Sequence, residues 1–351
     1  MSIRRLLVLL TAAVLVPACG GSHDSVAPPP TPRTLGLHVG GSELSTYDGA
    51  VHLARSAGVS AVPLLLPWKS LETAPGVYDG TLLDIMNAYY PATSIRVSLT
   101  IAALNTNVNE LPSDLSTLPF DHPTVLARFR QLLDFVFARI PALDLVSLNI
   151  GNEVDASLSG AVEVGRYSTF YAAAADYARS KRSGLPVGVV VSFTGLTGPD
   201  KALFQSLNAS SDIISVTYYP LTGDFKVRPP SAVASDVQAV LEAYPATPIY
   251  IQEAGYPSSA ACDSSEQAQT EFVREVFKAW DAHADRIPFL AFLSQTDWPP
   301  AVVDDLSAYY HLSTPGFKGY LGSLGLRTWS GTGTDKPAWS TLRTEAAARG
   351  W

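Results

Sequence analysis

Two glutamates stand where apolar runs of the sequence end, and their side chains suit acid–base and nucleophilic chemistry. Glu153 follows residues 145–150, an apolar and small-residue run that predicts a buried parallel strand. Glu253 ends a second β-rich run that begins at residue 248. When one carboxyl group carries a proton and its partner is ionised, the pair can protonate a leaving group and attack the atom that it leaves. The two glutamates are therefore the first candidates for a catalytic site.

The spacing of the two glutamates fits a repeated strand–helix architecture. They lie one hundred residues apart, and a βα unit takes about 30 residues or slightly more, so they should end strands three units apart. The chain contains eight strand-like runs, mostly separated by helical patterns, and no Gly-rich phosphate turn follows the first run. These features favour an α/β fold, a single (β/α)8 TIM barrel, over an open doubly wound sheet. The predicted strands are residues 35–40, 61–66, 95–101, 145–150, 186–191, 213–219, 248–253 and 289–294.

Composition narrows the function classes. The 351 residues are 47% hydrophobic and 16% charged, which suits one globular unit with a large core. The net charge of −8 comes without a basic stripe, so we expect no nucleic-acid partner. The six histidines form no His-x-His or His-Glu-x-x-His group, and no Gly-x-Ser-x-Gly elbow occurs. We therefore expect neither a metal nor another cofactor, and no serine hydrolase triad.

The chain begins with an export signal. Two arginines at positions 4 and 5 precede an apolar run over residues 6–16. That run is too short to span a bilayer as a stable helix and has the length of a signal-peptide core. We expect an exported protein that faces the periplasm or the cell exterior.

The end of this signal, Val-Pro-Ala-Cys at residues 16–19, resembles a bacterial lipobox. The resemblance implies that residues 1–18 are a lipoprotein signal peptide and that Cys19 is lipidated, which would anchor the protein to a membrane. An ordinary secretory signal with an incidental cysteine is the alternative. Residues 19–34, rich in Pro, Gly and Ser, then read as a tether before a barrel over residues 35–351.

The glutamates and their neighbours resemble glycoside hydrolase clan A, the retaining (β/α)8 glycosidases. In that clan the acid/base is the Glu of an Asn-Glu pair ending strand four, and the nucleophile is a Glu ending strand seven. The resemblance implies that Glu153 is the acid/base, that Glu253 is the nucleophile, and that Asn152 hydrogen-bonds a sugar 2-hydroxyl. It also implies a tyrosine at the end of strand six that donates to the nucleophile. Tyr218 and Tyr219 are the candidates, and Tyr218 is slightly preferred.

Aromatic residues near the predicted barrel mouth are candidates for sugar stacking, since a flat ring offers apolar area to the face of a pyranose. Trp298 follows strand eight, a position that commonly forms the substrate floor in the clan. Trp68 follows strand two and could stack on a sugar or simply pack against the first loop. Gln295 and Asp297 could bind hydroxyls, and His38 is interpreted as a satisfied interior histidine.

The substrate is the least determined feature. Residues 252–258 resemble the nucleophile segment of β-1,3-glucanases, residues 218–220 resemble endo-β-1,4-galactanases, and residues 68–79 resemble β-mannanase and β-xylosidase relatives. The long loop over residues 102–123 suggests a cleft with several subsites. We therefore expect a retaining hydrolase of β-linked oligo- or polysaccharides that works by double displacement as a monomer. A non-catalytic glycan-binding lipoprotein on the same barrel is the alternative.

Overall fold

The computed structural model describes residues 33–40, 47–329 and 333–351. The predicted signal peptide, Cys19 and the tether up to residue 32 lie outside these residues. Within the described part of the chain, no helix is long and apolar enough to cross a membrane.

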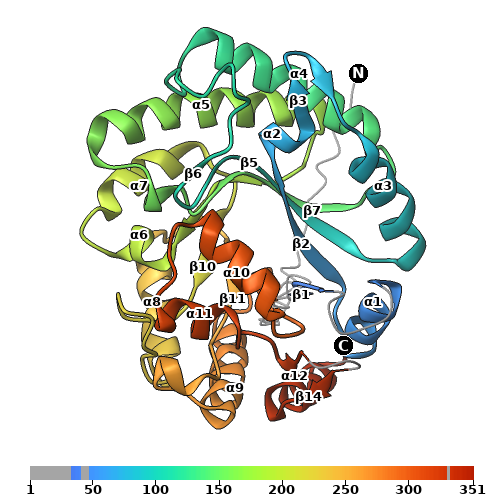
Figure 1. Cartoon of the computed structure of the whole chain (residues 1–351), viewed down its shortest axis with the longest axis vertical. Coiled ribbons are helices and arrows are strands. Elements are labelled where there is room, and N and C mark those ends of the chain that lie inside the picture. The colour runs from blue at the N-terminus through green and yellow to red at the C-terminus, as the bar shows by residue number, and fades with distance from the viewer. Residues whose placement is uncertain (1–32, 41–46, 330–332) are drawn as a thin grey trace, which may run out of the picture. The chain divides into compact units, whose positions relative to one another are not determined.

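A barrel of parallel strands forms the centre of the fold (Figure 1). Its strands follow one another in the order β8-β7-β5-β2-β1-β12-β11-β10-β9, and every pairing along this path is parallel. Only Val189 separates β8 from β9, so the two are halves of one strand, and the sheet closes through it. The eight predicted strands and the (β/α)8 barrel are therefore confirmed. The strands are β1 (Thr34–Leu37), β2 (Ala61–Pro67), β5 (Arg96–Asn105), β7 (Leu145–Asn152), β8 (Val187–Gly188), β9 (Val190–Ser192), β10 (Ile214–Tyr218), β11 (Ile249–Ala254) and β12 (Phe289–Phe292).

Helices cover the outside of the barrel where the 3.6-residue pattern predicts them. α4 buries Val125, Phe129, Leu132, Leu133 and Val136 along one face. α5 buries Val164, Tyr167, Phe170 and Tyr171 on its barrel-facing side. These helices are α1 (Tyr47–Ser56), α3 (Thr81–Thr93), α4 (Pro123–Arg139), α5 (Gly160–Lys181), α8 (Ala232–Ala243) and α9 (Glu266–Ala282).

Several short helices were not predicted. α6 (Phe193–Thr197) and α7 (Lys201–Leu207) lie between strands five and six. α10 (Pro300–Tyr309) and α11 (Pro315–Leu321) follow β12, and each begins at a proline, whose fixed φ suits the first turn of a helix. In Figure 1 these two orange-red helices lie over the side of the barrel that contains β10 and β11. The final helix, α12 (Pro337–Ala348), packs against α9.

The barrel interior is polar beneath the mouth. The Ser98 hydroxyl lies 2.7 Å from that of Ser147 and donates to Oε1 of Gln252 at 2.8 Å. Ser215 donates to Oδ1 of Asn149 at 2.6 Å. Because these bonds join β5, β7, β10 and β11, they tie together the four strands that carry the candidate site.

Candidate active site

The C-terminal ends of β7 and β11 place the two glutamates in one cavity. Glu153 directly follows β7, and Glu253 is the penultimate residue of β11. Both line a cavity of about 590 Å³ at the barrel mouth. Asn152 also lines this cavity, as do Asn105 and Thr106 at the end of β5. The first part of the long loop over residues 102–123 thus contributes to the cavity lining.

A constrained turn aims Glu153 into the cavity. Gly151 has a φ of 93° and Glu153 a φ of 44°, both in the left-handed region. A Cβ at residue 151 would lie 2.1 Å from the Tyr167 hydroxyl, so only glycine fits there. That hydroxyl donates to the carbonyl oxygen of Ile150 at 3.1 Å and holds the end of the strand against α5.

The carboxyl group of Glu153 is held by two threonines. Thr217 donates from its hydroxyl to Oε1 at 2.6 Å, and Thr106 donates to Oε2 at 2.9 Å. Thr217 belongs to β10 and Thr106 follows β5, so two other strands of the barrel fix the orientation of the acid that follows β7. Neither threonine is recognisable from the sequence alone, because a threonine near a strand end carries no distinctive signal.

The two glutamates occupy different electrostatic environments. Burial raises the pKa of Glu153 to about 7, and the negative charge of Glu253 adds to this effect. Burial also raises the pKa of Glu253, but a hydrogen bond from the Tyr219 hydroxyl to Oε2, 2.5 Å long, opposes that rise. The pKa of Tyr219 is itself raised by burial and by the charge of Glu253, so its hydroxyl keeps its proton as a donor. This arrangement favours a protonated Glu153 and an ionised Glu253 near neutral pH.

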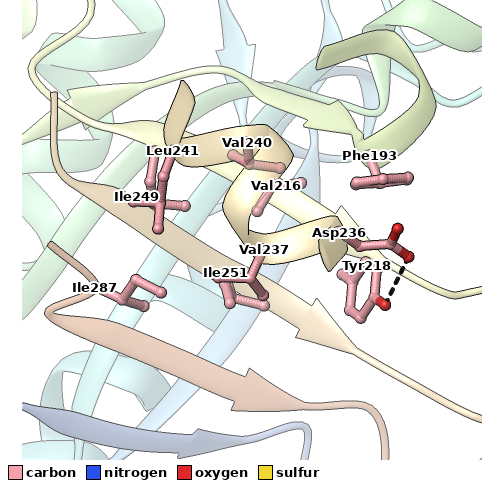
Figure 2. Close-up of a pocket in the computed structure, with 10 residues that line it drawn as sticks. All are labelled: Phe193, Val216, Tyr218, Asp236, Val237, Val240, Leu241, Ile249, Ile251 and Ile287. Carbon is pink, nitrogen blue, oxygen red and sulfur yellow. Dashed lines mark hydrogen bonds between the residues drawn. The ribbon is translucent and has the colours of Figure 1, made fainter. Parts of the chain in front are cut away.

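The slight preference for Tyr218 as the partner of Glu253 was wrong, and Tyr219 takes that place. Tyr218 instead lies between the sheet and α8, where its hydroxyl donates to Oδ2 of Asp236 at 2.9 Å (Figure 2). Its surroundings there are apolar side chains such as Val237 and Ile251. The physical reason is strand alternation: consecutive residues point to opposite faces, so only one of the two tyrosines can face the mouth.

Asn152 belongs to a buried amide network. Its Nδ2 donates to Oδ1 of Asn105 at 3.0 Å, and Nδ2 of Asn105 donates to the Tyr309 hydroxyl at 2.9 Å. That hydroxyl in turn donates to Oε1 of Glu110, which is fully buried and pairs with Lys69. Through Tyr309 the network connects Asn152 to α10. The role of Asn152 toward a sugar hydroxyl stays a prediction.

The two tryptophans differ in position. Trp298 is half-buried and lines the cavity, which is where a stacking residue has to lie. Trp68 is fully buried, donates from Nε1 to Oε2 of Glu72 at 2.8 Å and packs edge-on against Phe129. The stacking prediction for Trp68 was therefore wrong, because the turn after β2 points the indole into the core.

Gln295, Asp297 and His38 all have interior partners. Gln295 is fully buried and donates to the carbonyl oxygen of Ala50. Asp297 forms an ion pair of 2.7 Å with buried Lys336, so these two side chains hold the C-terminal segment rather than line the cavity. His38 does line the cavity, and its Nε2 lies 3.1 Å from the carbonyl oxygen of Gln252. Burial lowers the pKa of His38 to about 4, which keeps the imidazole neutral.

The rest of the cavity is largely apolar and comes from segments that the sequence analysis left unassigned. α10, α11 and the chain around residue 221 contribute most of it. Among the residues that the structure describes, no group of three or more His, Cys, Asp and Glu side chains is arranged to hold a metal ion. The cavity-lining residues not yet named are Leu65, Asn107, Ala156, Leu221, Phe225, Leu293, Leu306, Tyr310, Leu312, Phe317, Tyr320 and Leu321.

Fold and site together define a (β/α)8 barrel with two buried carboxyl groups in one cavity at the C-terminal ends of its strands. No family model matches the chain, and no curated protein matches its sequence.

Solved structures do share the fold. A GH5_18 protein from Streptomyces cattleya in complex with GlcNAc is similar with a TM-score of 0.68 and 15% identity, over 92% of this chain and 81% of that one. The exo-β-1,4-mannosidase Op5Man5 from Opitutaceae bacterium strain TAV5 also has a TM-score of 0.68, with 14% identity over 90% of this chain and 59% of that one. Xylanase 10C from Cellvibrio japonicus in complex with xylopentaose has a TM-score of 0.66 and 14% identity, over 91% and 68% of the two chains. At such identities the similarity establishes the barrel fold.

Proposed function

We propose that this protein is a retaining glycoside hydrolase that cleaves β-linked glycosides by double displacement. The observation that carries the proposal is the pairing of Glu153 and Glu253 in one cavity, with environments that favour opposite protonation states. Hydrolysis with retention needs one carboxyl group that is protonated and one that is ionised on the two sides of a glycosidic bond.

The mechanism assigns one task to each glutamate. The carboxylate of Glu253 attacks the anomeric carbon while Glu153 gives its proton to the glycosidic oxygen, so the leaving group departs as an alcohol. A covalent glycosyl-enzyme remains. Glu153, now ionised, takes a proton from water, and the resulting oxygen nucleophile displaces Glu253 from the anomeric carbon. This second step restores the proton on Glu153 and the carboxylate of Glu253, so the two steps together return both groups to their starting states.

The solved structures with a similar fold support this assignment. They include a mannosidase, a xylanase bound to xylopentaose and a barrel bound to GlcNAc, so carbohydrate recognition recurs on this fold. By analogy we assign a carbohydrate substrate to this chain as well. The apolar run and the Val-Pro-Ala-Cys sequence at residues 6–19 support export and a lipid anchor at Cys19.

The decisive experiment is product analysis on purified protein with β-linked glucosides, mannosides, galactosides and xylosides, including oligo- and polysaccharides. Proton NMR of the first product should show the β-anomer, the result of retention. Glu253→Gln should abolish turnover while substrate still binds. Binding without product release by the wild-type protein would instead support the glycan-binding alternative, and initial formation of the α-anomer would overturn double displacement.

A further inference from the structure

The cavity is divided into a polar and an apolar part. The polar part lies at the strand ends, where Asn105, Asn152 and Tyr219 surround the two glutamates. The apolar part comes from α10, α11 and the chain that follows β10. The division follows the architecture in part, since the two added helices deliver most of the apolar side chains, while Leu65 and Leu293 at strand ends add two more.

The apolar part is a packed wall. Buried Val303, Phe317 and Leu321 form its base, and half-buried side chains pack against this base. The ring of Phe225 lies 5.1 Å from that of Phe317 and 5.5 Å from that of Tyr320, measured between centroids. We call this surface the α10–α11 wall, and its half-buried members are Phe225, Trp298, Leu306, Tyr310, Leu312 and Tyr320.

The hydroxyls of Tyr310 and Tyr320 lie close enough to the two glutamates to feel their charges and so belong with the polar part. The aliphatic side chains of the wall do not match a chain of sugars. A sugar carries hydroxyls around its rim. Moving each hydroxyl out of water without giving it a new hydrogen-bond partner costs free energy and weakens binding. Aromatic rings can still cover the face of a pyranose, but aliphatic side chains such as Leu306 and Leu312 offer no partner to the rim. An apolar group has no such desolvation cost, and each methylene that it buries strengthens binding by about fourfold.

Resting on the proposed function, we propose that the substrate is a β-glycoside with an alkyl or aryl leaving group, which the α10–α11 wall binds. The sugar that is cleaved occupies the polar part, where both glutamates can reach its anomeric carbon. The volume of about 590 Å³ lies in the ~300–1,000 Å³ range of pockets that enclose a small molecule. This assignment replaces the polysaccharide expected from the length of the third loop.

The test compares leaving groups on a constant sugar. For each sugar of the panel, kcat/KM of the full-length protein is measured with the methyl glycoside, the octyl glycoside and the β-linked disaccharide. We expect the octyl glycoside to exceed both others by about fiftyfold or more. Leu312→Ser and Leu306→Ser should each reduce that preference at least fivefold.

Val302→Ser provides the matched control, because Val302 lies on the same helix as Leu306, is 38% exposed and does not line the cavity. Its octyl preference should equal that of the wild type. Hydrolysis of disaccharides at or above the rate of octyl glycosides would overturn the apolar leaving group while leaving the proposed function intact. Hydrolysis of no glycoside at all would overturn the proposed function itself.

Discussion

The Tyr219 hydroxyl donates a hydrogen bond to Oε2 of Glu253 at 2.5 Å, whereas its sequence neighbour Tyr218 donates to Asp236 on the opposite side of the same strand end. Two adjacent tyrosines thus have different surroundings: Tyr219 lies in the cavity, and Tyr218 packs beneath α8. The bond to Glu253 stabilises the ionised form of its carboxyl group and opposes the rise in pKa that burial causes. The proposed nucleophile therefore depends on one phenolic donor.

Tyr219→Phe should lower kcat by about tenfold to a hundredfold, because a hydrogen bond to a charged group is worth about 1.5–3 kcal/mol. Its loss removes the influence that lowers the pKa of Glu253, so the acidic limb of the kcat/KM profile should move to higher pH. Tyr218→Phe is the control of equal size and should leave that limb in place. An unshifted limb in Tyr219→Phe would show that the hydroxyl does not support the carboxylate.

Glu253→Gln should lower the pKa of Glu153 from about 7, because the charge of Glu253 contributes to that elevation. Burial remains, so the pKa should stay above the ordinary value of 4.5. Carbon-13 NMR of protein labelled at glutamate side-chain carboxyls can follow the titration directly. Assignment comes from the peak lost in Glu153→Gln. An identical titration in wild type and Glu253→Gln would contradict the coupling.

The elevated pKa of Glu153 has a consequence for stability. The unfolded chain ionises this carboxyl near 4.5 and the folded protein near 7, so the folded state binds the proton more tightly. Its stabilising contribution is complete below pH 4.5 and is lost as the pH rises through 7. Glu153→Gln lacks this pH-dependent loss. The free energy of unfolding of the variant minus that of wild type should therefore rise by about 3 kcal/mol from pH 4 to pH 8.

Urea unfolding at several pH values measures this gain. Glu163→Gln is a control of opposite sign, because hydrogen bonds from Ser159 lower the pKa of that exposed carboxyl. Wild type should therefore gain stability from Glu163 as the pH rises through 4.5, and the variant should lose that gain. If the stability of Glu153→Gln depended on pH in the same way as that of wild type, the raised pKa of Glu153 in the folded protein would be refuted.

Substitution of Trp298 should mainly weaken substrate binding, whereas substitution of Trp68 should mainly lower the stability of the fold. Trp298→Ala removes a cavity wall residue and should raise KM about tenfold with a small change in the free energy of unfolding. Trp68→Ala empties a fully buried site and should cost about 3–5 kcal/mol in stability. Steady-state kinetics and denaturant unfolding on both variants provide the comparison. A reversal of the two effects would show that Trp68, rather than Trp298, contacts substrate.

Much of the architecture follows from the sequence alone. Apolar runs with β-branched or leucine cores mark the eight strands, and polar residues that interrupt them mark the mouth, because parallel strands buried on both faces tolerate little polarity along their length. Glu153 and Glu253 are visible for this reason. The periodic apolar positions of α4 likewise predict a one-sided helix.

Only the tertiary structure decided which of two similar candidate residues reaches the cavity, and which other residues surround it there. Tyr218 and Tyr219 are chemically identical in sequence, and only the exact end and twist of β10 turns the second toward Glu253. Trp68 and Trp298 both follow strands, yet local turns send one inward and the other to the mouth. The α10–α11 wall arises because residues remote from the glutamates fold back over them, and local sequence patterns do not encode which distant surfaces meet.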